Sequence, residues 1–290
     1  MSEIAPSGQK VLDQLVGLLD LETIEVDIFR GVSPQVSMQR VFGGQVAGQA
    51  LVAAGRTVPE DRAVHSLHAY FLRPGDPAVP IVYTVDRIRD GRSFTSRRVI
   101  AVQHGKAIFS LSASFHRPED GIEHQDRMPD VPAPESLATL QERMEPYAGP
   151  LGLWARLPRP IDVRYVDDPP WVQREKGPRS GSHHVWMRAS GSLPDDPLLH
   201  VCALTFASDL TLLDPVLMRH GIAWGIDNVM GASLDHAMWF HRPFRADEWL
   251  LYESMSPTAS DARGLAMGRI WTRDGRHVVS VVQEGLVRAG

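Results

Sequence analysis

Three polar residues in the second half of the sequence have side chains suited to hydrolysis by an activated water. Asp209 follows a long apolar run, Ser233 stands just before a strand-like segment, and Gln283 lies in the apolar run 278–287. A carboxylate can accept a proton, a hydroxyl can relay a proton or orient a neighbouring group, and an amide can hold a water or a developing oxyanion. Taken singly, each is more often a cap, turn or strand residue, and spacing alone does not assemble them. They are candidates that the fold must bring together.

The region around these residues repeats an earlier part of the chain. Residues 65–115 align with residues 234–285, with Tyr70 on Trp239. Two of the three polar positions change between the copies: Gln283 aligns with Ala113, and Ser233 with Val64. Such a repeat predicts a duplicated folding unit, in which the core pattern is kept while the site residues change between the copies. We therefore expect one working site per chain.

Length, charge and cysteine content narrow the class of protein. The length of 290 residues predicts either two domains or one large fused domain, and the repeat favours two. A net charge of -5 argues against nucleic-acid binding, which needs a basic face. Cys202 is the only cysteine, so an intrachain disulfide cannot form and a reducing cytoplasm fits best. No apolar run reaches the ~20 residues that span a bilayer, and the first ten residues do not read as a signal peptide, so neither membrane insertion nor secretion is expected.

Helix and strand patterns occur in the same order in both halves. The first half predicts a helix at 10–21, a strand at 23–30, a buried helix from Phe42 to Ala54, and an antiparallel meander at 65–72, 79–90, 93–103 and 106–116. The second half predicts a strand at 183–189, a helix beginning at Pro197, and strands at 234–240, 248–256, 262–271 and 277–287.

This order predicts an α+β fold in which a curved antiparallel sheet wraps a long apolar helix, because a parallel sheet would need a crossover after each strand. Two such units can pair edge to edge and so remove exposed strand edges. We expect a first unit at 1–118, a proline-rich linker at 119–180 with a helix near 134–144, and a second unit at 181–290 that carries the site.

Other motifs are weak. The sequence has no G-x-S-x-G elbow and no dinucleotide or Walker A pattern. His236 and His241 lack the companions of a metal site and are interpreted as structural, so neither metal nor cofactor is expected. Gly43 and Gly44, at the start of the first buried helix, have two interpretations. They either offer backbone N–H groups to an oxyanion or allow the helix to pack closely against the sheet.

Several segments together resemble the type II acyl-CoA thioesterases, a family that includes the bacterial medium- and long-chain enzyme and the peroxisomal acyl-CoA thioesterases. These segments are VFGGQVAGQAL (41–51), LTFASDL (204–210), SLDHAMWFHRPF (233–244), WLLYES (249–254) and SVVQEGLVR (280–288). The resemblance implies a double hotdog fold in which Asp209, Ser233 and Gln283 activate the hydrolytic water. Bacterial members often carry Thr where this chain has Ser233, and the hydroxyl is kept.

The resemblance also implies a substrate and an assembly. Fatty acyl-CoA is the expected substrate, with coenzyme A as part of it, and chains are expected to form homo-oligomers. The acyl chain length is not defined by the sequence. Two alternatives stay open at this stage: a hotdog protein that binds acyl-CoA or acyl carrier without turnover, and a hotdog hydratase. The hydratase lacks support because its expected Asp-His pair and loop are not evident.

Overall fold

The computed structural model describes residues 8–34, 40–155 and 157–290. Residues 1–7 and 35–39 of the first predicted unit, and residue 156 of the predicted linker, lie outside the described residues.

The first half of the chain has the predicted buried helix followed by strands. The bounds are α1 Gly8–Leu19, β1 Glu22–Glu25, β2 Ile28–Gly31, α2 Gly43–Gly55, β3 Ala63–Phe71, β4 Ile81–Asp90, β5 Phe94–Gln103 and β6 Lys106–His116. The single strand predicted at 23–30 is wrong, because Asp27 adopts a left-handed φ of 60° and turns the chain into the hairpin of β1 and β2.

The second half repeats this order with additions. Its elements are β8 His183–Ala189, α6 Pro197–Ser208, α7 Asp214–Met218, β9 Val229–Ser233, β10 Asp235–Phe240, β11 Leu250–Ser260, β12 Arg263–Thr272 and β13 His277–Ala289. Asp196 caps α6 by accepting from the backbone N–H groups of Leu198 and Leu199, with Pro197 in the first turn as predicted. The sequence did not predict α7 or β9.

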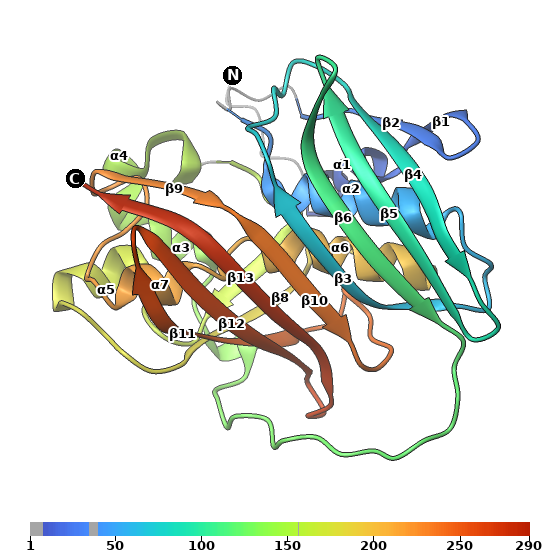
Figure 1. The fold of residues 1–290 in the computed structure, drawn as a ribbon. Helices are drawn as coiled ribbons and strands as arrows, with labels where there is room; N and C mark the ends of the chain where they lie inside the picture. Colours follow the sequence, from blue (N-terminus) through green and yellow to red (C-terminus); the bar gives the residue numbers. More distant parts are fainter. Residues whose placement is uncertain (1–7, 35–39, 156) are drawn as a thin grey trace.

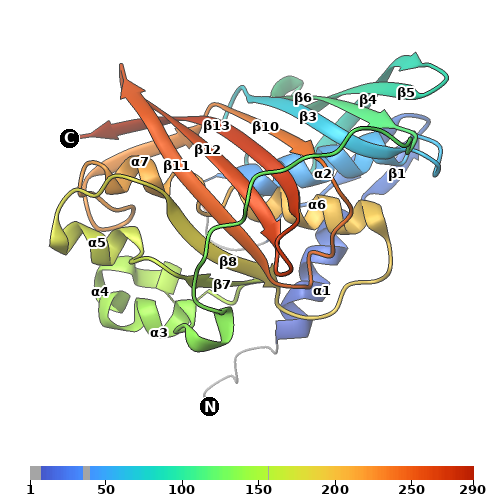
Figure 2. The ribbon, with the colours of Figure 1, turned by 90° about the horizontal axis from the view of Figure 1, so that it is seen from below.

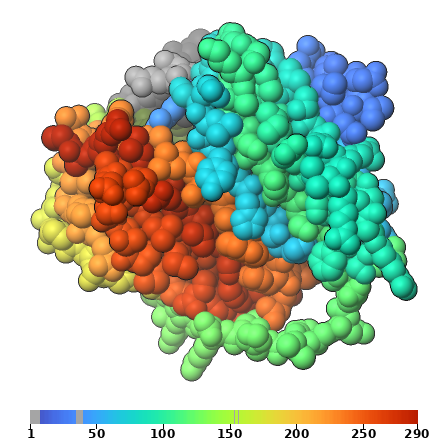
Figure 3. Space-filling view, in the orientation of Figure 1, coloured from blue at the N-terminus to red at the C-terminus, as the bar shows by residue number. Residues whose placement is uncertain are grey.

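The proline-rich segment between the halves is more regular than predicted. It contains η1 Pro134–Ser136, α3 Leu140–Met144, η2 Glu145–Tyr147, α4 Ala148–Leu151, η3 Gly152–Ala155, β7 Ile161–Tyr165 and α5 Pro170–Lys176. β7 pairs with β8, so part of this segment extends the second half of the sheet. Figure 3 shows the stretch after β6 running along the lower edge of the molecule from the first half toward the second. The unit boundaries at 118 and 181 stay a prediction.

Within the described residues, thirteen strands form one antiparallel sheet in the order β1-β2-β4-β5-β6-β3-β10-β13-β12-β11-β8-β7, with β9 beside β13 (Figure 1). The predicted simple meander is wrong at its first strand, because β3 pairs with β6 and not with β4. This order leaves the other edge of β3 free to pair with β10. The two halves therefore join edge to edge, which confirms the predicted arrangement.

The register at this junction supports the internal repeat. Tyr70 lies opposite Asp235, and Ser66 lies opposite Trp239. Because Tyr70 aligns with Trp239 in the repeat, Ser66 aligns with Asp235. The two pairs therefore exchange under a two-fold axis between β3 and β10, and the halves are related as two copies of one unit.

The long helices α2 and α6 pack against each other on one side of the sheet, and α1 lies beside them (Figure 2). Glycines in α2 allow this contact: a β-carbon on Gly44 would lie 2.4 Å from the carbonyl oxygen of Phe206, and one on Gly48 would lie 3.2 Å from that of Cys202. The close contact at Gly44 is therefore between two helices, whereas the predicted contact was between helix and sheet. Every residue of α2 from Gly44 to Ala54 is buried, as predicted. Among the described residues, no helix is both long and apolar enough to cross a membrane.

Candidate active site

Asp209, Ser233 and Gln283 lie in direct hydrogen-bond contact, and we call them the Asp–Ser–Gln cluster. Ser233 Oγ donates to Asp209 Oδ1 over 3.1 Å. Gln283 Nε2 donates to the same carboxylate oxygen over 2.9 Å and to Ser233 Oγ over 2.8 Å. Gln283 is fully buried, whereas Asp209 and Ser233 are partly exposed. The structure brings all three predicted residues together.

Three elements of the second half position these side chains. Asp209 is the residue that ends α6. Ser233 is the last residue of β9 and lies opposite Gly285 of β13. Gln283 precedes Gly285 by two positions, so its side chain and Gly285 share one face of the strand. The unpredicted strand β9 is thus what carries the hydroxyl to the amide.

The N-terminus of α2, from the first half, faces the carboxylate of Asp209. A β-carbon on Gly43 would lie 2.7 Å from Asp209 Oδ2 and 2.8 Å from the ring of Phe71. The N-cap residue of α2, Phe42, makes no side-chain capping bond, and the first N–H groups of a helix have no backbone partner within it. A carboxylate at the end of α6 would be unfavourable alone, but the positive end of α2 offsets the negative end of α6.

A second layer of polar side chains lies behind Gln283. His236 Nδ1 is hydrogen-bonded to Gln283 Oε1, and His236 Nε2 lies 2.9 Å from Ser208 Oγ. Gln283, His236 and Ser208 are all nearly inaccessible to solvent. The sequence interpretation of His236 as a structural histidine missed its contact with the candidate site. Its companion in that interpretation, His241, contacts Ser280 instead.

The first half lacks this polar arrangement at the equivalent place. Ala113 and Arg97 are opposite each other in β6 and β5, as Gln283 and Ala266 are in β13 and β12. Arg97 is 1% exposed, and its guanidinium donates to Thr57 and Asp90. A structural arginine therefore lies opposite the position that aligns with Gln283. This agrees with the expectation of one working site per chain.

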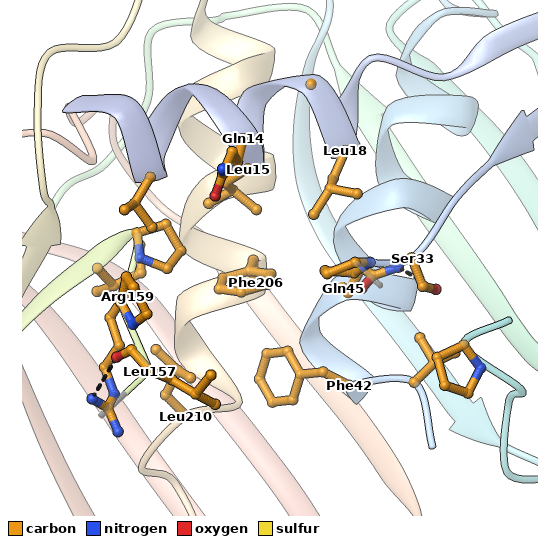
Figure 4. A pocket seen from close by; sticks show the side chains of 18 of the residues that line it. Gln14, Leu15, Leu18, Ser33, Phe42, Gln45, Leu157, Arg159, Phe206 and Leu210 are labelled. Atoms are coloured by element: carbon orange, nitrogen blue, oxygen red, sulfur yellow. Dashed lines mark hydrogen bonds between the residues drawn. The ribbon is translucent and has the colours of Figure 1, made fainter. Parts of the chain in front are cut away.

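An apolar cavity of about 660 Å³ lies near the Asp–Ser–Gln cluster, although no residue of the cluster lines it. Phe42 and Leu210, the neighbours in sequence of Gly43 and Asp209, both line it. Figure 4 shows Leu15 and Leu18 of α1 lying across the cavity from Phe42, with Phe206 between. Further lining residues come from the segment before β7 and from its first residue, and include Trp154, Leu157, Pro158 and Ile161. The cavity is suited to a flexible hydrocarbon chain.

The class of fold is clear from this architecture and from a structural comparison. A protein of unknown function with a hotdog fold from Alicyclobacillus acidocaldarius superimposes with a TM-score of 0.76 at 20% identity, covering 96% of this chain and 98% of that one. At this identity the likeness concerns the fold alone. The single sheet has two halves, joined through β3 and β10, and each half comes with its own long buried helix, so the chain is a double hotdog, as predicted.

Sequence comparisons define the family. Residues 155–286 match the profile described as acyl-CoA thioesterase, and residues 32–116 match the acyl-CoA thioesterase N-terminal domain. The chain is 42% identical over 283 residues to human acyl-coenzyme A thioesterase 8, covering 93% of this chain and 88% of that protein. It superimposes on acyl-CoA thioesterase II TesB2 from Mycobacterium marinum with a TM-score of 0.78 and 46% identity, covering 96% of this chain and 98% of that one. The chain belongs to the acyl-CoA thioesterase family, a class of thioester hydrolases, which confirms the resemblance found in its sequence.

Proposed function

We propose that the chain hydrolyses fatty acyl-CoA to the free acid and coenzyme A, with a water held by the Asp–Ser–Gln cluster as the nucleophile. One observation carries this proposal: the three side chains form a closed hydrogen-bonded set, and the residue after Asp209, Leu210, lines an apolar cavity. Similar proteins that are named acyl-CoA thioesterases support the choice of substrate. Incubation with a panel of acyl-CoA esters, followed by a thiol reagent, tests the activity directly.

The chemistry follows from the proton acceptor and its donors. Asp209 takes one proton from the water as the water oxygen bonds to the thioester carbonyl carbon. Ser233 and Gln283 orient the water and the carboxylate. The carbonyl oxygen becomes an oxyanion, which the backbone N–H groups at the start of α2 can stabilise. The carbon–sulfur bond then breaks, the electron pair leaves with sulfur, and the thiolate takes the proton from Asp209. The products are one acid and one thiol.

The acyl chain is assigned to the apolar cavity between α1, α2 and α6. Leu210 follows Asp209 and Phe42 precedes Gly43, and both line the cavity, so an alkyl chain attached to a carbonyl beside Asp209 is expected to enter it there. Burial of each methylene contributes about 0.8 kcal/mol. The depth of the cavity should therefore set the preference for chain length.

Replacing Leu18 with Trp is expected to shift this preference toward short chains. Leu18 is partly buried and projects into the cavity, so a larger ring there displaces the far end of a long acyl chain (Figure 4). Each methylene that no longer fits removes about 0.8 kcal/mol of binding energy from the transition state and so lowers kcat/KM for the long substrate. The ratio of kcat/KM for palmitoyl-CoA to that for butyryl-CoA measures the effect. Ile122→Trp, at a residue 98% exposed, is the control. An unchanged ratio would place the acyl chain elsewhere.

Replacing Gly43 with Ala is expected to lower kcat by about 10-fold or more, because displacements near 1 Å at a reacting group can cost ~100-fold. The added methyl group would lie 2.7 Å from Asp209 Oδ2, so the carboxylate or α2 must move. Gly149→Ala, also in a helix but with open space around the new carbon, should leave kcat unchanged. Steady-state kinetics and thermal melting of both variants separate an effect on catalysis from an effect on stability. Equal kcat values in both variants would mean that the α2 terminus does not constrain Asp209.

The alternative of a non-catalytic acyl-CoA binding protein makes a different prediction. Such a protein would retain acyl-CoA in equilibrium dialysis and release no thiol over many hours. The cluster argues against it, since binding alone needs no carboxylate held by a hydroxyl and an amide.

Three further properties belong to the proposal. We place the protein in the cytoplasm, on the ground that its single cysteine, Cys202, is buried and free and that burial raises the pKa of its thiol. We expect no metal or other cofactor, so a chelator should leave hydrolysis unchanged. Association of whole chains into homo-oligomers stays a prediction, which light scattering can test.

A further inference from the structure

The buried pair of His236 and Gln283 has no polar counterpart in the first half. In the repeat, Leu67 stands at the position of His236, just as Ala113 stands at the position of Gln283. Leu67 and Ala113 lie directly opposite each other in β3 and β6, and both are buried. The fold therefore accepts an apolar pair at this place. The histidine occurs only in the half where the amide occurs, which indicates a role toward that amide.

The cluster dictates which way the amide of Gln283 must face. Asp209 Oδ1 is an acceptor at 2.9 Å, so the NH₂ group of Gln283 must face it and the amide oxygen must face away. The amide oxygen then meets His236 Nδ1. A bare ring nitrogen would repel that oxygen, so Nδ1 must carry a proton.

The other ring nitrogen completes the same argument. Desolvation by burial lowers the pKa of His236, although the nearby charges of Asp209 and Asp235 raise it, and a neutral ring carries only one proton. With Nδ1 protonated, Nε2 is an acceptor, so the Ser208 hydroxyl at 2.9 Å must donate to it and not to the carbonyl oxygen of Thr205, which lies 3.0 Å from the same Oγ. Tyr252 hydroxyl donates to the carbonyl oxygen of Ser208 over 3.3 Å and helps to fix that residue.

From this geometry we infer that His236 is a positioning residue, held as the Nδ1–H tautomer by Ser208, that locks the amide of Gln283 with its NH₂ group toward Asp209 and Ser233. This inference rests on the proposed function of the Asp–Ser–Gln cluster. The hydrogen bonds run in one direction from Ser208 through His236 and Gln283 to Asp209. His236 contacts no reacting atom, so its effect is on kcat through the orientation of Gln283.

Two substitutions separate the two ring nitrogens. The amide nitrogen of Asn occupies the place of Nδ1, whereas that of Gln reaches the place of Nε2. His236→Asn can still donate to Gln283 and should keep most of kcat. His236→Gln should contact Ser208 and release Gln283, and its kcat should fall by about 10- to 100-fold, as misplacement of a catalytic group does, with KM unchanged. A structural role alone would lower the melting temperature of both variants and leave their kcat values alike.

The tautomer is measured on the unsubstituted protein and needs no variant to fold. Nitrogen NMR of histidine-labelled protein, with the His236 signals assigned by their absence from His236→Asn, should show a neutral ring protonated at Nδ1. A ring protonated at Nε2, or equal kcat values in the Asn and Gln variants, would overturn the positioning role. Full activity of Gln283→Ala would instead overturn the proposed mechanism, so the two failures are distinct.

Discussion

Replacing Asp209 with Asn is expected to lower kcat for acyl-CoA hydrolysis by about 10²- to 10⁴-fold, the usual contribution of a general base. The amide of Asn can accept the hydrogen bond from Ser233 but cannot take a proton from water. KM should change little, because the acyl chain and coenzyme A keep their contacts. Release of free thiol from saturating acyl-CoA measures the effect.

A matched control removes a carboxylate far from the cluster. Asp261 lies in the turn between β11 and β12, with its side chain 82% exposed and a positive φ that Asn tolerates. Asp261→Asn should therefore keep kcat and the melting temperature of the unsubstituted protein. If Asp209→Asn turned over acyl-CoA as fast as this control, Asp209 could not be the proton acceptor.

Replacing Gln283 with Ala is expected to lower kcat by about 10²- to 10³-fold, as loss of an oriented donor to the reacting oxygens does in other sites. The same change should cost about 1–3 kcal/mol of unfolding free energy, because the buried His236 loses its partner. The backbone tolerates the small side chain, since Ala113 stands at the equivalent position in β6. Kinetics and chemical denaturation of one preparation give both quantities.

A control variant, Gln103→Ala, separates the loss of kcat in Gln283→Ala from its loss of stability. Gln103 is a buried amide in β5 that donates to the carbonyl oxygens of Asp76 and Val79. Its removal should cost a similar free energy of unfolding and leave kcat unchanged. A parallel loss of kcat in Gln103→Ala would show that stability, and not the position of the amide, limits turnover.

The sequence predicted the elements whose signals are local. The buried helices α2 and α6 and the strands that follow them are apolar runs bounded by turn residues, and these patterns depend on near neighbours. β7 was missed because prolines surround it, and β9 because the chain before it is rich in glycine. The pairing of β3 with β6 and β10 was beyond local patterns, since strand order depends on contacts far apart in sequence.

The candidate site was predicted through the family resemblance, because chemistry alone left Asp209, Ser233 and Gln283 as separate candidates. Their grouping depends on α6, β9 and β13 converging in space. His236 was missed because its partners lie 28 and 47 positions away. In the repeat, His236 aligns with Leu67 and Gln283 aligns with Ala113. This joint change from apolar to polar residues was a signal in the sequence that could have revealed the pair of His236 and Gln283.

Rapid-quench kinetics of a single turnover, with enzyme in excess over acyl-CoA, tests direct attack by water most sharply. If water held by Asp209 attacks the thioester, coenzyme A and free acid will appear with one rate constant. The intact mass of the quenched protein will then stay unchanged at every time point. A burst of coenzyme A ahead of the acid, with an acyl group added to the protein mass, would contradict the account and make a side chain the nucleophile.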